Sequence, residues 1–192
     1  MLEGHGKGPR EVVTWLWDAL ETLKTALGLI LGLETYVEPP APEMTPITRE
    51  SEVRGRIEAR ARNLLGIRYV LGAEDADLRI ETRPPALDCS EAVELAYSQE
   101  AFFTHKMPDG AVNQHVFCQK VIDPQQADLG FMRYWSDKSK KVVWHVGILT
   151  SKGTVIHASG SRGEVVEDRR SVFASHHGFI GWGRHPEFKP EA

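Results

Sequence analysis

One cysteine of this chain, Cys89, directly precedes a run with helical spacing, in the stretch LDCSEAVELA (87–96). Unsatisfied backbone N–H groups and the helix dipole stabilise an anion at the N-terminus of a helix. A thiol in that position is expected to have a lowered pKa and to act as a nucleophile near neutral pH. A free cysteine is more commonly a small buried hydrophobic residue, so both interpretations stay open at this point. We expect Ser90 to help begin the helix rather than to react.

Two histidines could supply the base that a thiol nucleophile needs and the group that orients this base. His145 lies in the strand pattern VVWHVGILT and His157 in GTVIHAS, and the sequence Ser151-Lys-Gly between them indicates a tight hairpin. Residues equidistant from a hairpin turn face each other, and Ser151 is the midpoint of the two histidines. The spacing therefore predicts that the two imidazoles are near cross-strand neighbours on one face. A histidine in a strand can also be a hydrogen-bonded core residue.

The elements that must hold these residues are two helices followed by several strands. The first helix is predicted to begin near Thr48 and to end at Gly66. Its apolar stripe consists of Val53, Ile57, Ala61, Leu64 and Leu65, and its solvated face carries Arg54, Arg56, Arg60 and Arg62. Strand patterns follow in DLGFMRYW, VVWHVGILT, GTVIHAS, EVVED and GFIGWGRH. Helices followed by sequential strands with tight turns predict an α+β fold with a central antiparallel sheet.

The N-terminal segment, residues 11–33, has apolar residues at alternating steps of four and three, which is typical of an amphipathic helix. Acidic and basic residues interrupt it, so we expect neither a transmembrane helix nor a signal peptide. The helix would pack on its own domain, on a partner or on a second copy. The segment ETYVEPPAPEMTP contains four prolines and is expected to be an extended linker. We therefore predict two parts, 1–44 and 45–192.

Composition excludes several classes of function for this chain of 192 residues. Its 23 basic and 27 acidic residues give a net charge of −4, which offers no field for nucleic acid. Two cysteines are too few for a disulfide scaffold, and Cys118 is expected to be buried. The remaining histidines lack the spacing of metal ligands, and no phosphate-binding glycine loop is present. We therefore expect neither a metal nor a cofactor.

Three blocks in order, LLGIRYVLG, DCSEAVELAY and WHVGILTSKGTVIHASGSRG, resemble those of the NlpC-type cell-wall cysteine peptidases. These are compact papain-like enzymes, and the resemblance covers roughly residues 49–185. It implies a papain-like α+β fold in which Cys89 is the nucleophile, His145 the general base and acid, and His157 the polar residue that orients His145. It also implies that Tyr69 lies by the active site and helps, with the backbone N–H of Cys89, to hold the oxyanion.

Some positions depart from the family pattern. Glu91 replaces a glycine that is usual two residues after the nucleophile, and Leu71 and Ala73 replace a tryptophan and a glycine. A carboxylate that faced the thiolate would oppose its ionisation. We expect Glu91 to point away along the helix and to alter substrate preference. Asp88 and Ser90, which flank the nucleophile, are kept as candidate substrate-contacting residues.

The resemblance implies a substrate, the stem peptides of bacterial peptidoglycan, often cleaved at the γ-D-glutamyl–diaminopimelate bond. We interpret residues 11–33 as a helix that docks on phage tail or baseplate proteins. The chain would be made in the cytoplasm, carried on a tail tip and delivered to the cell wall of the next host. The alternatives are a free endolysin, a tail assembly protein whose peptidase fold is structural or processes a phage protein, and an amidase of the same superfamily.

Overall fold

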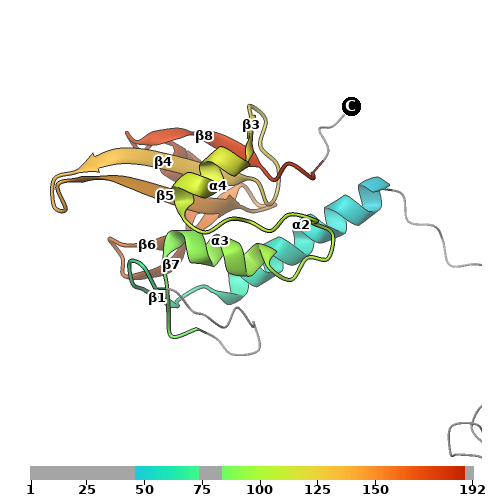
Figure 1. Ribbon diagram of the computed structural model, residues 1–192, viewed down its shortest axis with the longest axis horizontal. Helices are drawn as coiled ribbons and strands as arrows, with labels where there is room; N and C mark the ends of the chain where they lie inside the picture. The colour runs from blue at the N-terminus through green and yellow to red at the C-terminus, as the bar shows by residue number, and fades with distance from the viewer. Residues whose placement is uncertain (1–45, 74–83, 189–192) are drawn as a thin grey trace, which may run out of the picture. The chain divides into compact units, whose positions relative to one another are not determined.

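The computed structural model describes residues 46–73 and 84–188, shown in Figure 1. The helices are α2 (Pro46–Asn63), α3 (Cys89–Tyr97), α4 (Ala111–Phe117) and α5 (Arg170–Ala174). The strands are β1 (Arg68–Tyr69), β2 (Ala86–Leu87), β3 (Gln119–Val121), β4 (Leu129–Ser136), β5 (Lys141–Leu149), β6 (Thr154–Ser159), β7 (Glu164–Arg169) and β8 (Phe179–Arg184). The predicted docking helix and linker lie outside the described residues. Within 46–73 and 84–188, no helix has the length and apolar character needed to cross a membrane.

The eight strands form one sheet in the order β2-β1-β7-β6-β5-β4-β8-β3. The α+β class is confirmed, but the sheet is mixed rather than antiparallel, because β1 and β2 pair in parallel. In this pairing Tyr69 lies opposite Leu87, two residues before Cys89. The parallel pair therefore joins the segment that carries Tyr69 to the segment that leads into α3.

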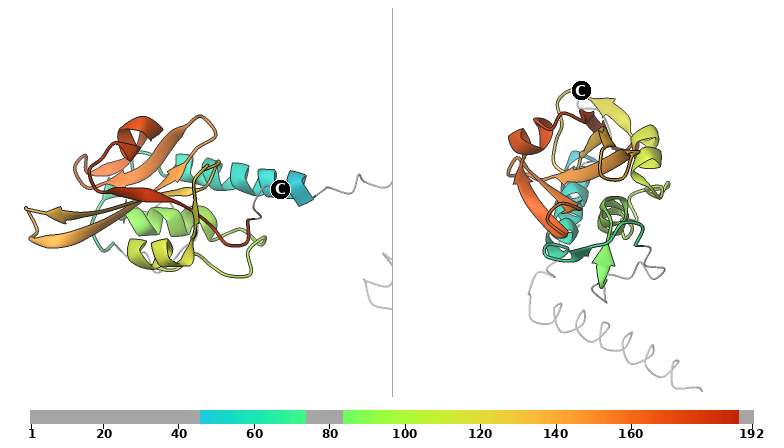
Figure 2. Two further views of the ribbon diagram at one scale, coloured as in Figure 1. Left: turned by 90° about the horizontal axis from the view of Figure 1, so that it is seen from above. Right: turned by 90° about the vertical axis from the view of Figure 1, so that its left-hand side faces the viewer.

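The sheet separates two apolar clusters, as expected when successive side chains of a strand point to opposite faces. The larger cluster unites α2 and α3 with one face of the sheet and includes Phe131 of β4 and Val146 of β5. These two helices lie beside the strands in Figures 1 and 2. The smaller cluster, on the opposite face, includes Met132 and Phe173 of α5. His145 and His157 both contact the ring of Phe173, so they belong to this second face.

The prediction that Arg54 lies on a solvated face is wrong. Its side chain is 6% exposed and donates to the carboxylate of Asp128, with 3.2 Å between Nη1 and Oδ1. Arg184 of β8 donates to the same carboxylate through Nε and Nη2. Asp128 precedes β4 directly, so the ion network fixes α2 against the start of β4 and the end of β8. The helical pattern of α2 could not show this, because the partner of Arg54 is a buried carboxylate far away in the sequence.

Candidate active site

The first turn of α3 is closed by an N-cap. Asp88 has an extended backbone, and its Oδ1 accepts from the backbone N–H of Ser90 at 2.9 Å and of Glu91 at 3.0 Å. The Ser90 hydroxyl donates to the same oxygen. Two backbone donors at the helix N-terminus are thereby satisfied, which is worth about 1 kcal/mol to the helix. Ser90 helps to begin the helix, as predicted, and both residues flanking Cys89 serve to hold the first turn in place.

Cys89 is the first residue of α3, and its residue exposure is 6%. The backbone N–H groups of Val146 and Ser90 favour its thiolate through hydrogen bonds. Burial and the nearby carboxylate of Asp88 outweigh them and raise the pKa of Cys89 to about 12. The expectation of a lowered pKa is therefore wrong for the resting protein. The Val146 contact places the sulfur beside β5, one residue from His145.

His145 and His157 are in direct contact, with 2.8 Å between His145 Nε2 and His157 Nδ1. Their planes are nearly perpendicular, at 83°. Burial, and then the neighbouring His157 and His176, lowers the pKa of His145 to about 3. The pKa of His157 is also lowered, chiefly by burial. Both rings are therefore neutral at pH 7.

The predicted register of the β5–β6 hairpin is off by one residue at its centre. The strands pair at Ile148 with Ile156 and at Leu149 with Val155, which is symmetric about Lys152 rather than Ser151. The two histidines are consequently diagonal neighbours and not directly opposite. The observed register differs from the predicted one by two residues. Side chains alternate between faces along a strand, so a shift of two leaves both histidines on the same face.

His145 and His157 form a row of hydrogen-bonded side chains across the sheet, and a third polar residue, Asp168, continues it. The sequence did not reveal Asp168 as part of the site. Asp168 of β7 lies with Oδ2 at 3.0 Å from Nε2 of His157. Arg162, in the turn before β7, forms an ion pair with the same oxygen. In the sequence EVVEDR, three carboxylates are equivalent candidates, and only the β6–β7 register shows that Asp168 is the one beside His157.

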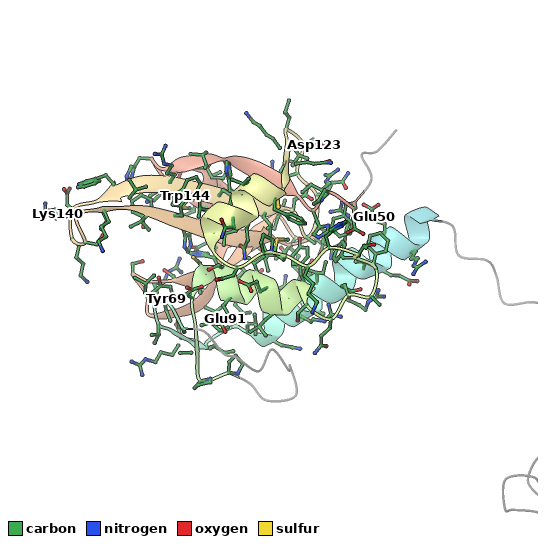
Figure 3. All side chains as sticks on the ribbon, viewed as in Figure 1. Glu50, Tyr69, Glu91, Asp123, Lys140 and Trp144 are labelled. Carbon is green, nitrogen blue, oxygen red and sulfur yellow. The ribbon has the colours of Figure 1, made fainter. Side chains whose placement is uncertain are left out.

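Two tyrosines lie near the sulfur. Burial, followed by the negative charges of Cys89 and Asp88, raises the pKa of Tyr69 to about 12. Figure 3 shows Tyr69 beside the N-terminal end of α3. The pKa of Tyr134 is raised by burial and then by Cys89, so this residue of β4 is a further neighbour of the sulfur. No sequence pattern pointed to Tyr134, because its position depends on how β4 is packed in the sheet.

Glu91 is buried on the first turn of α3 and is labelled in Figure 3. The pKa of Glu94 is raised to about 7 by burial and then by the carboxylates of Asp109, Glu91 and Asp88. The carboxylate that acts on Cys89 is that of Asp88. Glu91 therefore acts on Glu94, and the direction in which its side chain points stays a prediction.

Cys118, His115 and His105 are placed apart from this arrangement, whereas His176 is a neighbour of His145. Cys118 is partly exposed rather than buried. His115 packs against Phe131 and Trp144 with ring centroids 5.1 and 5.3 Å away. His105 pairs with Glu187. In the two described ranges, no group of three or more potential ligands is arranged to hold a metal ion.

A family model described as the NlpC/P60 family matches residues 66–179. The chain belongs to the NlpC/P60 family. The matched range is more than half of the chain and contains Tyr69, Cys89, His145, His157 and Asp168. Members of the family are generally cysteine peptidases that act on peptidoglycan.

Solved structures share the NlpC/P60 fold. The peptidoglycan hydrolase RipB of Mycobacterium tuberculosis is 18% identical, with a TM-score of 0.51 over 92% of this chain and 84% of its own. The NlpC/p60 domain of the peptidoglycan hydrolase SagA is 22% identical, with a TM-score of 0.50 over 68% of this chain and 97% of its own. A protein similar to an NLP/P60 lipoprotein of Staphylococcus aureus is 21% identical, with a TM-score of 0.52 over 82% of this chain.

The match covers 47% of the Staphylococcus aureus protein, so this chain corresponds to about half of that protein's length. No curated protein matches the sequence. Because all three structures are less than 25% identical, they establish the NlpC/P60 fold and leave the chemistry to be argued from the residues of this chain.

Proposed function

We propose that this chain is a cysteine peptidase that hydrolyses amide bonds in the stem peptides of bacterial peptidoglycan. One observation carries the proposal. Cys89 begins α3 with its sulfur against the Val146 N–H, and the residue before Val146 is His145, whose ring is held by His157. A thiol, a neutral imidazole and a group that orients the imidazole are the components of a cysteine peptidase. Membership of the NlpC/P60 family supports the substrate class.

The reaction would begin from a neutral thiol and a neutral imidazole. His145 uses Nε2 to contact His157, so Nδ1 is the nitrogen that takes the Cys89 proton as the sulfur attacks the amide carbonyl carbon. The resulting oxyanion would accept hydrogen bonds from the backbone N–H of Cys89 and from the Tyr69 hydroxyl. The carbon–nitrogen bond then breaks, and protonated His145 gives its proton to the leaving amine.

The second half of the reaction would release the acyl group. His145 removes a proton from water as the water oxygen attacks the thioester carbon. The carbon–sulfur bond breaks, the sulfur recovers a proton from His145, and a carboxylic acid leaves. Every proton removed in one step is returned in the next, so the cycle needs neither a cofactor nor a metal.

The experiment is digestion of purified sacculi by the full chain, with mass spectrometry of the soluble products. Cys89→Ala should abolish product formation, whereas Cys118→Ala is the matched control and should retain it. Unchanged hydrolysis by Cys89→Ala would overturn the proposal. If the wild-type chain digests sacculi, fragments cut at the γ-D-glutamyl–diaminopimelate bond would support the endopeptidase that we propose. Intact stem peptides freed from the sugar would indicate an amidase instead.

We further propose that residues 11–33 dock the enzyme on a phage or phage-like tail tip, so that it opens the wall of a host cell locally. The support is the apolar seam of this segment, with its coiled-coil spacing, followed by a proline-rich linker. Tail particles purified from a producing culture should contain the full chain. A variant that lacks residues 1–44 should be made but be missing from the particles. Finding the full chain only in the soluble lysate would favour a free endolysin.

A further inference from the structure

We propose that Asp168, held by Arg162, is a positioning residue that selects the tautomers of both histidines and so leaves Nδ1 of His145 as the basic nitrogen. This inference rests on the proposed function only for its catalytic consequence. The tautomers themselves can be measured without any substrate. Asp168 would act on the reaction entirely through His157 and His145.

The three side chains occupy adjacent strands and form one row across the sheet. His157 pairs in register with Val166 of β7, and Asp168 pairs with Val155 of β6, so Asp168 is one diagonal step from His157 on the same face. His145 is one diagonal step away on the other side, on β5. The row has separations of 2.8 Å between the imidazoles and 3.0 Å between imidazole and carboxylate. Both are hydrogen-bonding distances.

The direction of the hydrogen bonds follows from the chemistry of the carboxylate. An ionised carboxylate can only accept, so Nε2 of His157 must carry a proton and donate it to Asp168. In a neutral ring the other nitrogen, Nδ1, then has no proton and must accept from Nε2 of His145. His145 is thereby fixed with its proton on Nε2, and its Nδ1 keeps a free lone pair. That lone pair is the one that the proposed reaction needs.

The surroundings of the row keep each group in the required charge state. Arg162 and then His157 lower the pKa of Asp168 through hydrogen bonds, so this carboxyl is ionised at neutral pH. The groups that act on His157 are Asp168 and Arg162, and those that act on His145 are His157 and His176. The Arg162 side chain is 48% exposed, against 18% for Asp168 and 8% for His157. The arginine thus lies at the solvent end of the row, and the imidazoles lie inside.

The substitution Asp168→Asn tests directly which group donates and which accepts in each hydrogen bond of the row. An amide can turn its NH₂ group toward His157 and donate, which would make Nε2 of His157 an acceptor and reverse every bond in the row. His145 would then carry its proton on Nδ1, the nitrogen that should act as the base. We expect kcat on a soluble stem peptide to fall by roughly 10³- to 10⁴-fold, as when a triad aspartate is replaced by asparagine and the wrong tautomer results. The KM should change by less than about twofold, because Asp168 is connected to His145 only through His157.

The decisive measurement is two-bond proton–nitrogen correlation NMR on chain labelled with ¹⁵N-histidine, in a Cys89→Ala background. Single His145→Gln and His157→Gln variants assign the two rings. With Asp168 present, both should be the Nε2–H tautomer at pH 7.5, and Asp168→Asn should convert both to Nδ1–H. Glu164→Gln is the matched control: it removes an exposed carboxylate from the same strand and should leave both tautomers and kcat unchanged.

Two results would overturn the inference: both rings remaining Nε2–H in Asp168→Asn, or both already being Nδ1–H when Asp168 is present. Thermal unfolding of the Asp168→Asn variant should show one cooperative transition, which establishes that the rings are observed in a folded chain. If wild-type protein fails to cleave sacculi while the tautomers invert as described, the proposed function fails and the positioning role of Asp168 stands.

Discussion

His157 lies diagonally across the β5–β6 ladder from His145, and the two rings meet because the residue between them in space, Gly147, has no side chain. A Cβ atom on Gly147 would lie 3.0 Å from Cβ of His157 and 2.6 Å from Cγ1 of Val155. It would also lie 3.2 Å from the backbone oxygen of Ile156. The glycine of the WHVG block therefore sets the distance between the strands that carry the two histidines.

Gly147→Ala should force β5 and β6 apart, since one of the contacts is with backbone that cannot rotate away. We expect a loss of about 1–3 kcal/mol in the free energy of unfolding, as for other overpacked sites. The rate of sacculus hydrolysis should fall even under conditions where the variant is folded, because the His145–His157 contact is lost. Urea unfolding and product release measure the two effects.

The control for this substitution is Gly55→Ala in α2, where a new Cβ meets nothing within 4 Å. Removing a glycine from a helix interior should stabilise the chain by roughly 0.5–1 kcal/mol and leave activity unchanged. Equal activity of Gly147→Ala and wild type would show that the close approach of the strands is dispensable.

Alkylation by iodoacetamide reports the protonation state of Cys89. Because burial and Asp88 raise its pKa to about 12, the thiol is protonated at pH 7 and the thiolate fraction grows with pH. In a Cys118→Ala background, the labelling rate should rise about tenfold per pH unit from pH 7 to pH 10, since only the thiolate reacts. The rate is followed by intact mass.

A labelling rate that is fast and level between pH 6 and pH 9 would contradict this expectation. It would mean that a thiolate–imidazolium pair exists before substrate binds. The Cys89→Ala, Cys118→Ala double variant, which has no cysteine, is the control for reaction at other side chains.

The helix that begins at Cys89, the β5–β6 hairpin and the closeness of His145 and His157 were accessible from sequence because they depend on local patterns. Strand alternation, a short hairpin turn and helical spacing place those residues on β5, β6 and α3 without knowledge of the rest of the fold. The centre of the hairpin was wrong by one residue, Ser151 instead of Lys152, because the polar residues 150–153 do not show by themselves which of them form the turn.

Asp168 and Tyr134 could not be identified from sequence because their roles depend on long-range register. Asp168 reaches His157 only through the β6–β7 pairing, and Tyr134 comes under the influence of Cys89 only through the packing of β4 in the assembled sheet. The raised pKa of Cys89 has the same origin. The helix N-terminus is visible in the sequence, whereas the burial that outweighs it is a property of the assembled core.

His145 should make the stability of the chain sensitive to acid. Its pKa in the folded chain is about 3, below the value of about 6.5 in an unfolded chain. Between these values the unfolded chain binds more protons, so the contribution of neutral His145 is complete above pH 6.5 and is lost as the pH falls toward 3. From pH 7 to pH 5 the loss should be about 2 kcal/mol.

Urea unfolding at pH 7 and pH 5 measures this loss as a difference between variants, because other buried histidines such as His185 shift in the same direction. His145→Gln, which cannot titrate, should lose less stability than wild type over this range. His177→Gln replaces an exposed ring and should behave as wild type. If the free energy of unfolding depends on pH in the same way for His145→Gln and wild type, the pKa of His145 is the same in the folded and the unfolded chain, which would contradict the prediction.

Asp128→Asn should be the most destabilising single polar substitution outside the active site. Its carboxylate is fully buried and accepts from Arg54 and Arg184, so the amide would remove the negative charge that these two buried guanidinium groups share. Breaking a buried ion pair on one side costs about 3–5 kcal/mol. Asp123→Asn removes an exposed carboxylate only five residues away and should change the free energy of unfolding by less than about 0.5 kcal/mol. Urea unfolding of both variants at pH 7 tests the comparison, and similar midpoints for the two would show that the Arg54–Asp128–Arg184 network does not hold α2 to the sheet.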